Sequence, residues 1–343
     1  MHSKFTALVG LALVAPAVAL QPVLDGSVSL DEEFDAWAKH YGKTYSNADH
    51  REARKAIYAH ARAFVIEHNQ GFADGKHSFS VELNDKADIT NEEYRTQLLG
   101  LSSGASSPAS RAYDTFAPNG TAPASWDWRD TPNVVNPVKN QGGCGSCWAF
   151  SAVATMEGAY NLKNKALTQF SEQELVDCVN GGTSTCSVGG EMYQGVEYGI
   201  SNGMMGESDY PYKGTSGGGC HFDKSKVIQK FKGYTNITSG DENALMEAAY
   251  KQPIVSVGID ASSFWFQLYF GGVYDHAGCH NKADQLDHGV AVVGYGTDPK
   301  SKKDYWWVRN SWGSSWGMKG YIQMVRNKDN QCGIATQACF ATL

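Results

Sequence analysis

A stretch of eleven residues, QGGCGSCWAFS at positions 141–151, constrains this 343-residue chain more than any other feature. Its glycines predict a turn, and Cys147 stands where that turn passes into a helical pattern with Ser146 as the N-cap. A buried face of the helix follows at a spacing of three or four residues: Ala149, Val153, Met156 and Tyr160. A thiol at the N-terminus of a helix has a lowered pKa, because the helix dipole stabilises the thiolate. The stretch therefore indicates a cysteine nucleophile.

Other interpretations of this cysteine remain open at this point. Cys144 and Cys147 also form a C-x-x-C pair, which is typical of a redox dithiol or of half a zinc site. Zinc is disfavoured because no second C-x-x-C pair or close histidine pair supplies the other ligands. A structural cysteine buried in a helix is the third interpretation. We expect no metal and no other cofactor.

Two further motifs lie downstream, and each contains a residue that could be a partner of a cysteine nucleophile. Residues 286–296, LDHGVAVVGYG, contain His288, and residues 309–317, RNSWGSSWG, contain Asn310. A histidine beside an apolar run is often only a strand-end residue, but its order with the other two motifs favours catalysis. Together the three motifs resemble the papain family of cysteine proteases, and within it the cathepsin L-like members. The resemblance extends from about Leu30 to the C-terminus.

The resemblance implies an α+β, papain-like fold of two lobes, preceded by a mainly helical prosegment. The expected segments are a signal peptide at 1–19, an inhibitory prosegment at 20–121, and a peptidase domain at 122–343 with a helix-rich lobe at about 122–230 and a β-barrel-like lobe at about 231–343. Strand-like runs in the second lobe span residues 254–259, 290–293, 305–308 and 321–325. The active site would lie in the cleft between the lobes.

The resemblance also implies a role for each residue of the site. Cys147 would be the nucleophile, and His288 would hold the ion pair and then protonate the leaving amine. Asn310 would fix the tautomer of the imidazole. Gln141 would point its amide at the developing oxyanion, beside the Cys147 backbone N–H. Trp312 would cover the bond between the imidazole and Asn310 and keep water out.

A substrate-binding set follows from the same alignment. The paired glycines Gly189 and Gly190 would bind an extended substrate as an added strand, although one extra residue precedes them here. The S2 pocket would be formed by Met192, Gly258, Leu286, Gly289 and Gln337. Four of these are apolar or small, which favours a hydrophobic residue at P2. Gln337 is polar, and we expect it either to admit Arg or polar P2 residues or to turn to solvent; Asp287, beside His288, would tune local charge at the substrate site.

Eight cysteines allow many disulfide connectivities, and their spacing alone assigns none. The family pattern implies three disulfides: Cys144–Cys186, Cys178–Cys220 and Cys279–Cys332. Cys147 is then free for catalysis. Cys339 has no partner, and we expect it to be a small buried hydrophobic residue.

The N-terminus and the composition indicate a secreted chain. Residues 5–14 are apolar, and small residues at 15–19 provide a cleavage site, so this segment reads as a signal peptide that is too short to span a bilayer. Asn119 and Asn236 begin N-glycosylation triplets. A formal net charge of −7 argues against nucleic acid as a partner. No later apolar run in the sequence reaches transmembrane length.

The segment before residue 120 predicts mainly helices. A capping box at Ser29 and Glu32 starts one helix, which carries Phe34, Trp37 and Tyr41 on one face. A second helix at 49–68 would turn Ile57, Ala61 and Phe64 inward, and Phe79, Val81 and Leu83 would face one side of a strand at 78–83.

This layout resembles the inhibitory prosegment of cathepsin L-like zymogens, with uneven motifs. Its interspersed E-R-F/W-N-I-N helix motif falls on Arg51, Lys55, Tyr58, Ala61, Val65 and Asn69, where only the asparagine is kept. Its G-N-F-D motif falls on Glu82, Asn84, Lys86 and Asp88, where the second and fourth residues are kept. An independent N-terminal binding domain is the alternative.

Residues 101–110 are rich in Ser and Gly and predict a linker. The mature start is expected between Asn119 and Ala124. We expect the prosegment to run through the cleft in reverse and to be removed at acidic pH, with Asp88 at a family position linked to acid activation.

The sequence thus predicts a cysteine endopeptidase made as a zymogen, secreted or lysosomal. The alternatives are a dithiol oxidoreductase that uses Cys144 and Cys147, and an inactive binding protein on the same scaffold. Expected partners are protein and peptide substrates, the chain's own prosegment and cystatin-type inhibitors, and the expected state is a monomer.

Overall fold

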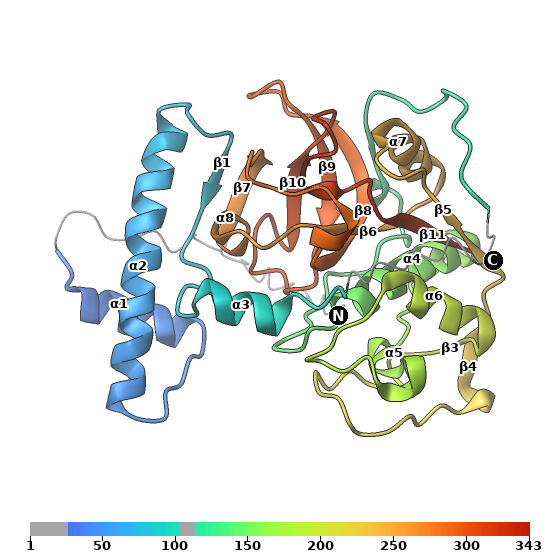
Figure 1. The fold of residues 1–343 in the computed structure, drawn as a ribbon, viewed down its shortest axis with the longest axis horizontal. Helices are drawn as coiled ribbons and strands as arrows, with labels where there is room; N and C mark the ends of the chain where they lie inside the picture. Colours follow the sequence, from blue (N-terminus) through green and yellow to red (C-terminus); the bar gives the residue numbers. More distant parts are fainter. Residues whose placement is uncertain (1–26, 103–113) are drawn as a thin grey trace, which may run out of the picture.

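The computed structural model describes residues 27–102 and 114–343 (Figure 1). The predicted signal peptide and most of the predicted linker lie outside the described residues. The helices are α1 (Leu30–His40), α2 (Ala48–Ala73), α3 (Asn91–Leu98), α4 (Cys147–Asn164), α5 (Glu172–Cys178), α6 (Met192–Ser201), α7 (Glu242–Lys251) and α8 (Phe264–Gln267). The strands are β1 (Phe79–Val81), β2 (Trp126–Asp127), β3 (Met204–Met205), β4 (Val227–Gln229), β5 (Gly233–Asn236), β6 (Val255–Ile259), β7 (Tyr269–Tyr274), β8 (His288–Thr297), β9 (Asp304–Arg309), β10 (Tyr321–Val325) and β11 (Ala338–Thr342). Short 3-10 helices span Trp128–Asp130, Val179–Gly182, Lys224–Lys226, Ala283–Gln285 and Gln331–Gly333.

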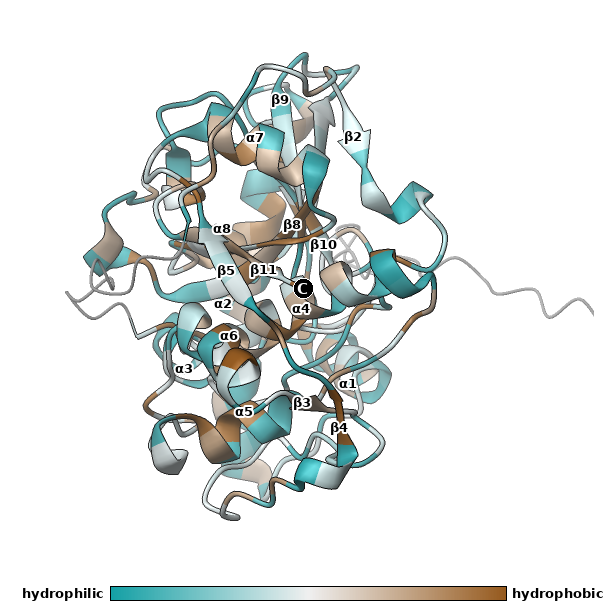
Figure 2. Cartoon of the chain, turned by 90° about the vertical axis from the view of Figure 1, so that its right-hand side faces the viewer, coloured by the Kyte–Doolittle hydropathy of each residue, from teal (hydrophilic) through white to brown (hydrophobic). Residues whose placement is uncertain are grey.

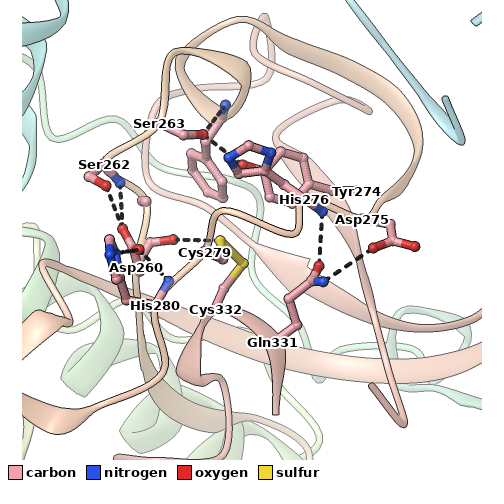
Figure 3. Close-up of a disulfide and its surroundings, with 12 residues drawn as sticks. Asp260, Ser262, Ser263, Tyr274, Asp275, His276, Cys279, His280, Gln331 and Cys332 are labelled. Carbon is pink, nitrogen blue, oxygen red and sulfur yellow. Dashed lines mark hydrogen bonds and ion pairs between the residues drawn. A yellow bond between two sulfur atoms is a disulfide. The ribbon is translucent and has the colours of Figure 1, made fainter. Parts of the chain in front are cut away.

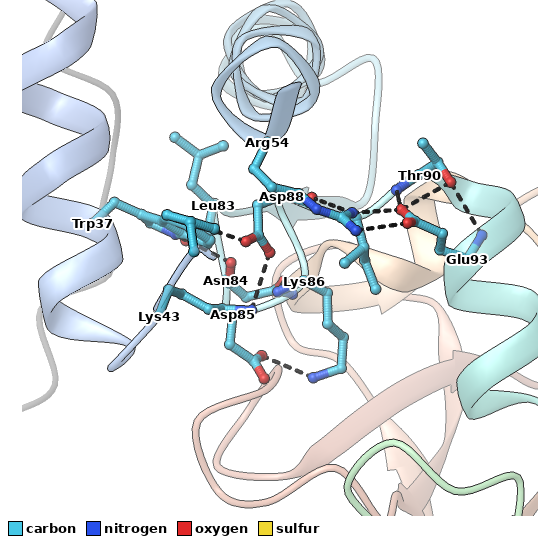
Figure 4. A network of polar contacts seen from close by, with 12 residues as sticks. Trp37, Lys43, Arg54, Leu83, Asn84, Asp85, Lys86, Asp88, Thr90 and Glu93 are labelled. Carbon is cyan, nitrogen blue, oxygen red and sulfur yellow. Dashed lines mark hydrogen bonds and ion pairs between the residues drawn. The ribbon is translucent and has the colours of Figure 1, made fainter. Parts of the chain in front are cut away.

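The N-terminal segment is built on two crossing helices, α1 and α2, which lie to one side of the rest of the chain (Figure 1). The predicted capping box of α1 is present, with Ser29 and Glu32 each bonding the other's backbone N–H. Trp37 is buried, and its indole N–H donates to the carbonyl of Leu83, 2.9 Å away (Figure 4). This bond ties α1 to the chain that follows β1.

Helix α2 is longer than the sequence predicted, because it continues to Ala73 instead of ending at His68. Its fully buried positions are Tyr58, Ala61, Val65, His68 and Gly71. The predicted inward positions are therefore only partly right, since Ile57 and Phe64 are half-buried. Ile57 lines a groove next to α3 and α8, and the ring of Phe64 packs edge-on against Phe264 of α8.

A single large sheet forms the strand-rich lobe and also takes up a strand of the N-terminal segment. Its strand order is β1-β7-β10-β9-β8-β6-β11-β5, with β2 paired to β8. The four predicted strand runs correspond to β6, β8, β9 and β10. Strand β1 adds antiparallel to β7, with Phe79 opposite Gly272. The face of β1 that carries Phe79, Val81 and Leu83 is buried, as the alternation predicted.

The helix-rich lobe is organised around α4, which is buried on nearly all sides. Strand β8 is buried along almost its whole length, and α4 packs against it and against β6 and β11. Figure 2 shows the hydrophobic colouring concentrated in this interior, around β8. The start of α4 and the start of β8 therefore meet where the two lobes join.

Each lobe contains residues from the far end of the other lobe's chain segment. Strand β2, at Trp126, pairs with β8, so the first residues of the expected helix-rich lobe belong to the large sheet. In return, Cys339 and Ala341 of β11 pack into the core of the helix-rich lobe. Residues from both ends of the peptidase part thus cross between the two lobes.

Candidate active site

Cys147 opens α4, and its side chain is fully buried. Its Sγ accepts hydrogen bonds from the backbone N–H groups of Gly289, 3.4 Å away, and of Gly100, 3.3 Å away. Gly289 lies in β8, and Gly100 follows α3. The predicted capping role of Ser146 is wrong: the residue stands at the N-cap, but its hydroxyl bonds the hydroxyl of Tyr212, 2.7 Å away. The sulfur therefore lies where both lobes and the N-terminal segment meet.

His288 opens β8 and is fixed in one orientation. Its Nε2 lies 2.9 Å from Oδ1 of Asn310, and the same oxygen accepts the backbone N–H of Ser311 at 2.8 Å. Because Oδ1 acts as an acceptor, Nε2 carries the proton and Nδ1 keeps its lone pair. Nδ1 is buried and has no hydrogen-bond partner within the described residues. The ring of Trp312 lies 4.8 Å away, centre to centre, and shields the bond from water.

Gln141 is fully buried beside the same site. Its Nε2 donates to the carbonyl oxygen of Leu98, 2.9 Å away, and to that of Cys144, 2.8 Å away. Its Oε1 accepts the hydroxyl of Ser311 at 2.6 Å. This acceptor bond orients the amide, so that its N–H groups point into the cleft.

The chain after α3 fills the cleft as a short extended segment. Leu101 donates its N–H to the carbonyl of Asp287 at 3.1 Å. On the other wall, Gly190 donates to the carbonyl of Gly100 at 3.0 Å, and Ser102 donates to the carbonyl of Gly190 at 3.1 Å. These two bonds form a parallel bridge between Leu101 and Gly190. The segment is thus held by backbone bonds from both lobes.

Close approach of backbones requires glycine on both sides of this contact. A Cβ on Gly189, whose φ is +73°, would lie 2.0 Å from the carbonyl oxygen of Gly100. A Cβ on Gly100 would lie 1.9 Å from the carbonyl oxygen of Gly145. No side chain fits at such distances. The extra residue before the glycine pair therefore does not prevent a strand-like contact with the prosegment.

The side chain of Leu101 enters the predicted S2 pocket. A Cβ on Gly258 would lie 2.9 Å from Cδ2 of Leu101 and 3.3 Å from both Cδ1 of Leu286 and Oε1 of Gln337. These three side chains therefore converge over Gly258. Oε1 of Gln337 is buried and unpartnered within residues 27–102 and 114–343, so the expectation that it turns to solvent is wrong. A cavity of about 230 Å³ extends behind it and reaches Met192.

Gly289 occupies a different place from that expected of a pocket residue. A Cβ there would lie 3.1 Å from Cα of Trp148 and 3.2 Å from the carbonyl oxygen of Cys147. Its small size lets β8 pack against the first turn of α4. Met192 begins α6, and its sulfur accepts the hydroxyl of Ser151 at 3.3 Å.

Burial sets the protonation of the site in the precursor. Burial raises the pKa of the Cys147 thiol to about 11, and this effect exceeds the lowering by the hydrogen bonds from Gly289 and Gly100. Burial lowers the pKa of His288 to about 4, and this effect exceeds the rise caused by the hydrogen bond to Asn310. Both groups are therefore neutral near pH 7. The expected lowering of the thiol pKa by the helix dipole is wrong for this state, because desolvation of the charged form is larger.

The residues that fill the cleft were missed by the sequence reasoning. Leu101 was assigned to a linker, whereas it is buried to 6% exposure between the two lobes. The tract Leu98-Leu99-Gly100-Leu101 is apolar and contains a glycine directly before the serine-rich run. That change in composition is the signal that could have separated a docked segment from a linker.

Three disulfides join the pairs implied by the resemblance: Cys144–Cys186, Cys178–Cys220 and Cys279–Cys332. The third links the loop after β7 to the loop before β11, next to Asp260, which accepts from Ser262 and His280 (Figure 3). Cys339 is free and buried in β11, as expected of a small hydrophobic residue. Cys144 is thus bonded to Cys186 and not to Cys147, which removes the dithiol required by the oxidoreductase alternative.

The two glycosylation triplets stand in different surroundings. Asn119 is exposed, and its Oδ1 accepts from Thr121 and Lys251. Asn236 ends β5, is half-buried and borders the cavity behind Gln337. Among the described helices, none is long and apolar enough to cross a membrane.

Comparison with known proteins matches both parts of the chain. Residues 122–342 match the papain family cysteine protease model, and residues 34–94 match the cathepsin propeptide inhibitor domain. Cathepsin S of Mus musculus is 39% identical over 343 residues, covering 99% of this chain and 98% of the mouse protein. Cathepsin L of Sarcophaga peregrina is 41% identical over 341 residues, covering 97% and 98%. The digestive procathepsin L2 proteinase of Tenebrio molitor larval midgut has a TM-score of 0.84 at 35% identity, covering 92% of this chain and 100% of that one.

The two-lobe fold, the buried thiol at the lobe junction and the segment that fills the cleft define a cysteine endopeptidase made as an inactive precursor. The chain belongs to the papain family of cysteine proteases, as a cathepsin L-like precursor whose prosegment is an intramolecular inhibitor. Residues 34–94 are therefore part of a propeptide inhibitor and not an independent binding domain.

Proposed function

We propose that Cys147 is the nucleophile of this endopeptidase and His288 its proton-transfer partner. The observation that carries the proposal is the hydrogen bond between Nε2 of His288 and Asn310. This bond fixes the neutral tautomer and leaves Nδ1 without a proton and without a partner among the described residues. Nδ1 can therefore take the thiol proton once the prosegment has left. The resulting thiolate and imidazolium stabilise each other, and the bond from Asn310 keeps the ring in place.

The reaction then follows from the positions of these groups. The thiolate adds to the substrate carbonyl carbon, and the oxyanion lies between the amide of Gln141 and the backbone N–H of Cys147. His288 gives its proton to the leaving amine as the C–N bond breaks, which leaves a thioester on Cys147. Water, deprotonated by His288, adds to the thioester, and the acid product departs with regeneration of the thiol.

The prosegment inhibits because its backbone does not present one and the same carbonyl group to both Cys147 and Gln141. The prosegment group that faces Sγ is the N–H of Gly100, whereas the prosegment carbonyl that accepts from Gln141 belongs to Leu98. A cleavable peptide needs its carbonyl carbon at the sulfur and the oxygen of the same carbonyl at the amide. The parallel bridge of Leu101 to Gly190 supports a segment that runs opposite to substrate, since a substrate bound by the paired glycines would be an antiparallel strand.

A hydrophobic P2 preference is supported by the residue that the precursor itself places in the pocket. Leu101 packs against Gly258 and Leu286, as an apolar P2 side chain would. Gln337 lies at the same spot with an unpartnered buried oxygen, which a P2 arginine or a polar P2 group would satisfy. We expect Gln337→Ala to lower the ratio of Arg-Arg to Phe-Arg dipeptidyl substrate cleavage; an unchanged ratio would remove this role.

The mature enzyme is proposed to begin between Asn119 and Ala124. A start in this range fits the proposed division of the chain into a prosegment at 20–121 and a peptidase at 122–343. Glu247 of α7 accepts the backbone N–H groups of Asn119, at 2.6 Å, and of Gly120. The peptidase match begins at residue 122. N-terminal sequencing of processed enzyme tests this boundary, and a start outside 119–124 would contradict it.

Processing at acidic pH is proposed to remove the prosegment. Asp88 is buried between Lys43 and Tyr45, each 3.0 Å from its carboxylate (Figure 4). These two bonds hold the chain after α1 to the segment before α3, so their loss would loosen α1 from the rest of the prosegment. Incubation of purified precursor from pH 4 to pH 7 tests the proposal; a chain of constant size at every pH, with or without added protease, would overturn it.

The remaining expectations concern the protein's surroundings. We propose entry into the secretory pathway, with an extracellular or lysosomal destination, a monomeric state, inhibition by cystatin-type proteins, and glycans on Asn119 and Asn236. Secretion is supported by the three disulfides and by the cathepsin relatives. Deglycosylation followed by mass spectrometry of the two asparagines tests the last point.

The decisive experiment labels the processed enzyme with an epoxysuccinyl inhibitor and identifies the modified residue. We expect modification of Cys147 alone, loss of label in Cys147→Ser, and retained label in Cys339→Ser. Label on another residue of an active enzyme would overturn the assignment.

A further inference from the structure

His68, on α2 of the prosegment, is held by two hydrogen bonds that only its neutral form can make together. Its Nδ1 lies 3.1 Å from the indole N–H of Trp265, and its Nε2 lies 3.0 Å from the carbonyl oxygen of Phe79. An indole nitrogen can only donate, so Nδ1 must accept and Nε2 must carry the proton. The side chain is 4% exposed.

These two bonds connect the prosegment to the peptidase. Trp265 belongs to α8 of the peptidase, whereas Phe79 belongs to β1, the prosegment strand that pairs with β7. The same strand pair is reinforced by the Ser78 hydroxyl, which donates to the carbonyl of Val273 at 2.6 Å. His68 therefore stands at the point where α2, β1 and α8 are fastened together.

A proton on Nδ1 of His68 would place two donors face to face. The imidazolium N–H and the indole N–H would then face each other across 3.1 Å. The positive charge would be buried, and no carboxylate is among the groups that shift the pKa of His68. Those groups are His77, stacked on His68 at 4.3 Å from the loop before β1, and His276, stacked on Trp265 at 4.7 Å from the segment after β7. A positive charge on either imidazole opposes one on His68. From α8 and β1, Trp265 and Phe79 present only an N–H and a carbonyl.

The surroundings of His68 leave room for the imidazole that stacks on it. A Cβ on Gly71, one turn along α2, would lie 2.6 Å from the ring of His77. The glycine therefore makes room for His77 over His68. His276 is labelled in Figure 3, on the loop that the Cys279–Cys332 disulfide closes, where Asp275 and Asp260 act on its charge.

We propose that His68 is a pH-dependent latch, which holds the prosegment on α8 when neutral and releases it when protonated. The latch rests on the proposed acid processing and adds to it a named residue through which pH would act. Burial lowers the pKa of His68 to about 4 in the docked precursor. In the undocked prosegment the imidazole titrates near about 6.5.

The sign of the effect follows from these two values. The docked state binds the proton less tightly than the undocked state, so His68 stabilises docking fully above about pH 6.5 and progressively less as the pH falls towards 4. Between pH 7 and pH 5 we expect the docking equilibrium to weaken about twentyfold through this one residue. Acidification thus frees β1 and α2 from the peptidase.

The test uses full-length precursor that carries Cys147→Ser, converted by a trace of active processed enzyme. The measured quantity is the ratio of precursor loss at pH 5 to that at pH 7, with each rate divided by the converting enzyme's activity on a peptide at the same pH. We expect His68→Gln, which does not titrate, to lower this ratio about twentyfold. The matched control is His60→Gln, an exposed histidine on the same helix that contacts Phe264, and its ratio should equal that of the parent.

A second variant covers the case in which His68→Gln does not fold. Trp265→Phe removes the opposing donor and keeps an aromatic ring, so protonation of His68 costs less and the ratio should also fall. An unchanged ratio in whichever variants fold overturns the latch while leaving the peptidase assignment intact. Absence of conversion at every pH, in parent and variants alike, would instead contradict the proposed acid processing.

Discussion

The backbone N–H of Gly100 points at the sulfur of Cys147 from 3.3 Å, in the place where a substrate would present a carbonyl carbon. The sulfur therefore faces a hydrogen-bond donor instead of an electrophile. The prosegment carbonyl that accepts from the amide of Gln141 belongs to Leu98, two residues before Gly100 in the chain. This mismatch explains how a segment can fill the cleft of a peptidase without being cut there.

The first prediction concerns the amide of Gln141. Gln141→Ala should lower kcat of the processed enzyme by about 10²-fold with little change in KM, because the amide would act on the oxyanion and not on the ground-state carbonyl. Steady-state kinetics on a peptide substrate measures both constants. An equal rise in KM with unchanged kcat would show a binding role instead, and unfolding temperature controls for a structural effect.

The second prediction concerns Leu101, which lies over Gly258 in the proposed S2 pocket. Leu101→Ala removes a buried apolar side chain, so the cleft of intact precursor should open roughly 30-fold more often. The rate at which an epoxysuccinyl inhibitor labels the intact precursor measures that opening. Leu30→Ala, in the same segment but 39% exposed, should leave the labelling rate unchanged. A rate equal to that of the parent in Leu101→Ala would contradict this role of the Leu101 side chain.

The third prediction concerns the ionisation of the thiol. In the precursor burial raises the pKa of Cys147 to about 11, so the thiolate is scarce near neutral pH and its alkylation should accelerate only as the solution becomes alkaline. Removal of the prosegment rehydrates the site and allows the ion pair with His288, so the processed enzyme should react rapidly near pH 6. Iodoacetamide inactivation rates of both forms, followed from pH 5 to pH 10, test this. Identical profiles would show that the prosegment does not control the ionisation.

The fourth prediction concerns Asp88. Asp88→Asn should destabilise the precursor by about 1–2 kcal/mol, because it weakens the bonds from Lys43 and Tyr45 to a carboxylate of which 5% is exposed. The expected readout is a lower unfolding temperature for the precursor and an unchanged one for the processed enzyme. Asp74→Asn, which removes an exposed partner of Lys76, is the matched control. Equal unfolding temperatures for Asp88→Asn and the parent would contradict the structural role of this carboxylate.

Much of the fold and site could be predicted from local patterns. The capping box of Ser29, the apolar alternation of β1 and the four strand runs are local signals, and the structure contains each of these elements. The end of α2 was misplaced because Asn69 and Gly71 are residue types that often end a helix, whereas here the amide of Asn69 bonds β1 and the helix continues to Ala73. Ser146 was misassigned because its hydroxyl finds Tyr212, which is far away in the sequence.

The sequence by itself determined the chemistry: the order of Cys147, His288 and Asn310, and the glycines that a close backbone contact requires. Only the tertiary structure decided the state of that chemistry, because burial depends on what the rest of the chain places around the site. The segment Gly100–Ser102 looks like the start of a linker until it is seen between the lobes, where it excludes water and keeps both the thiol and the imidazole uncharged. The same holds for His68, whose donors and acceptors come from elements distant in the chain.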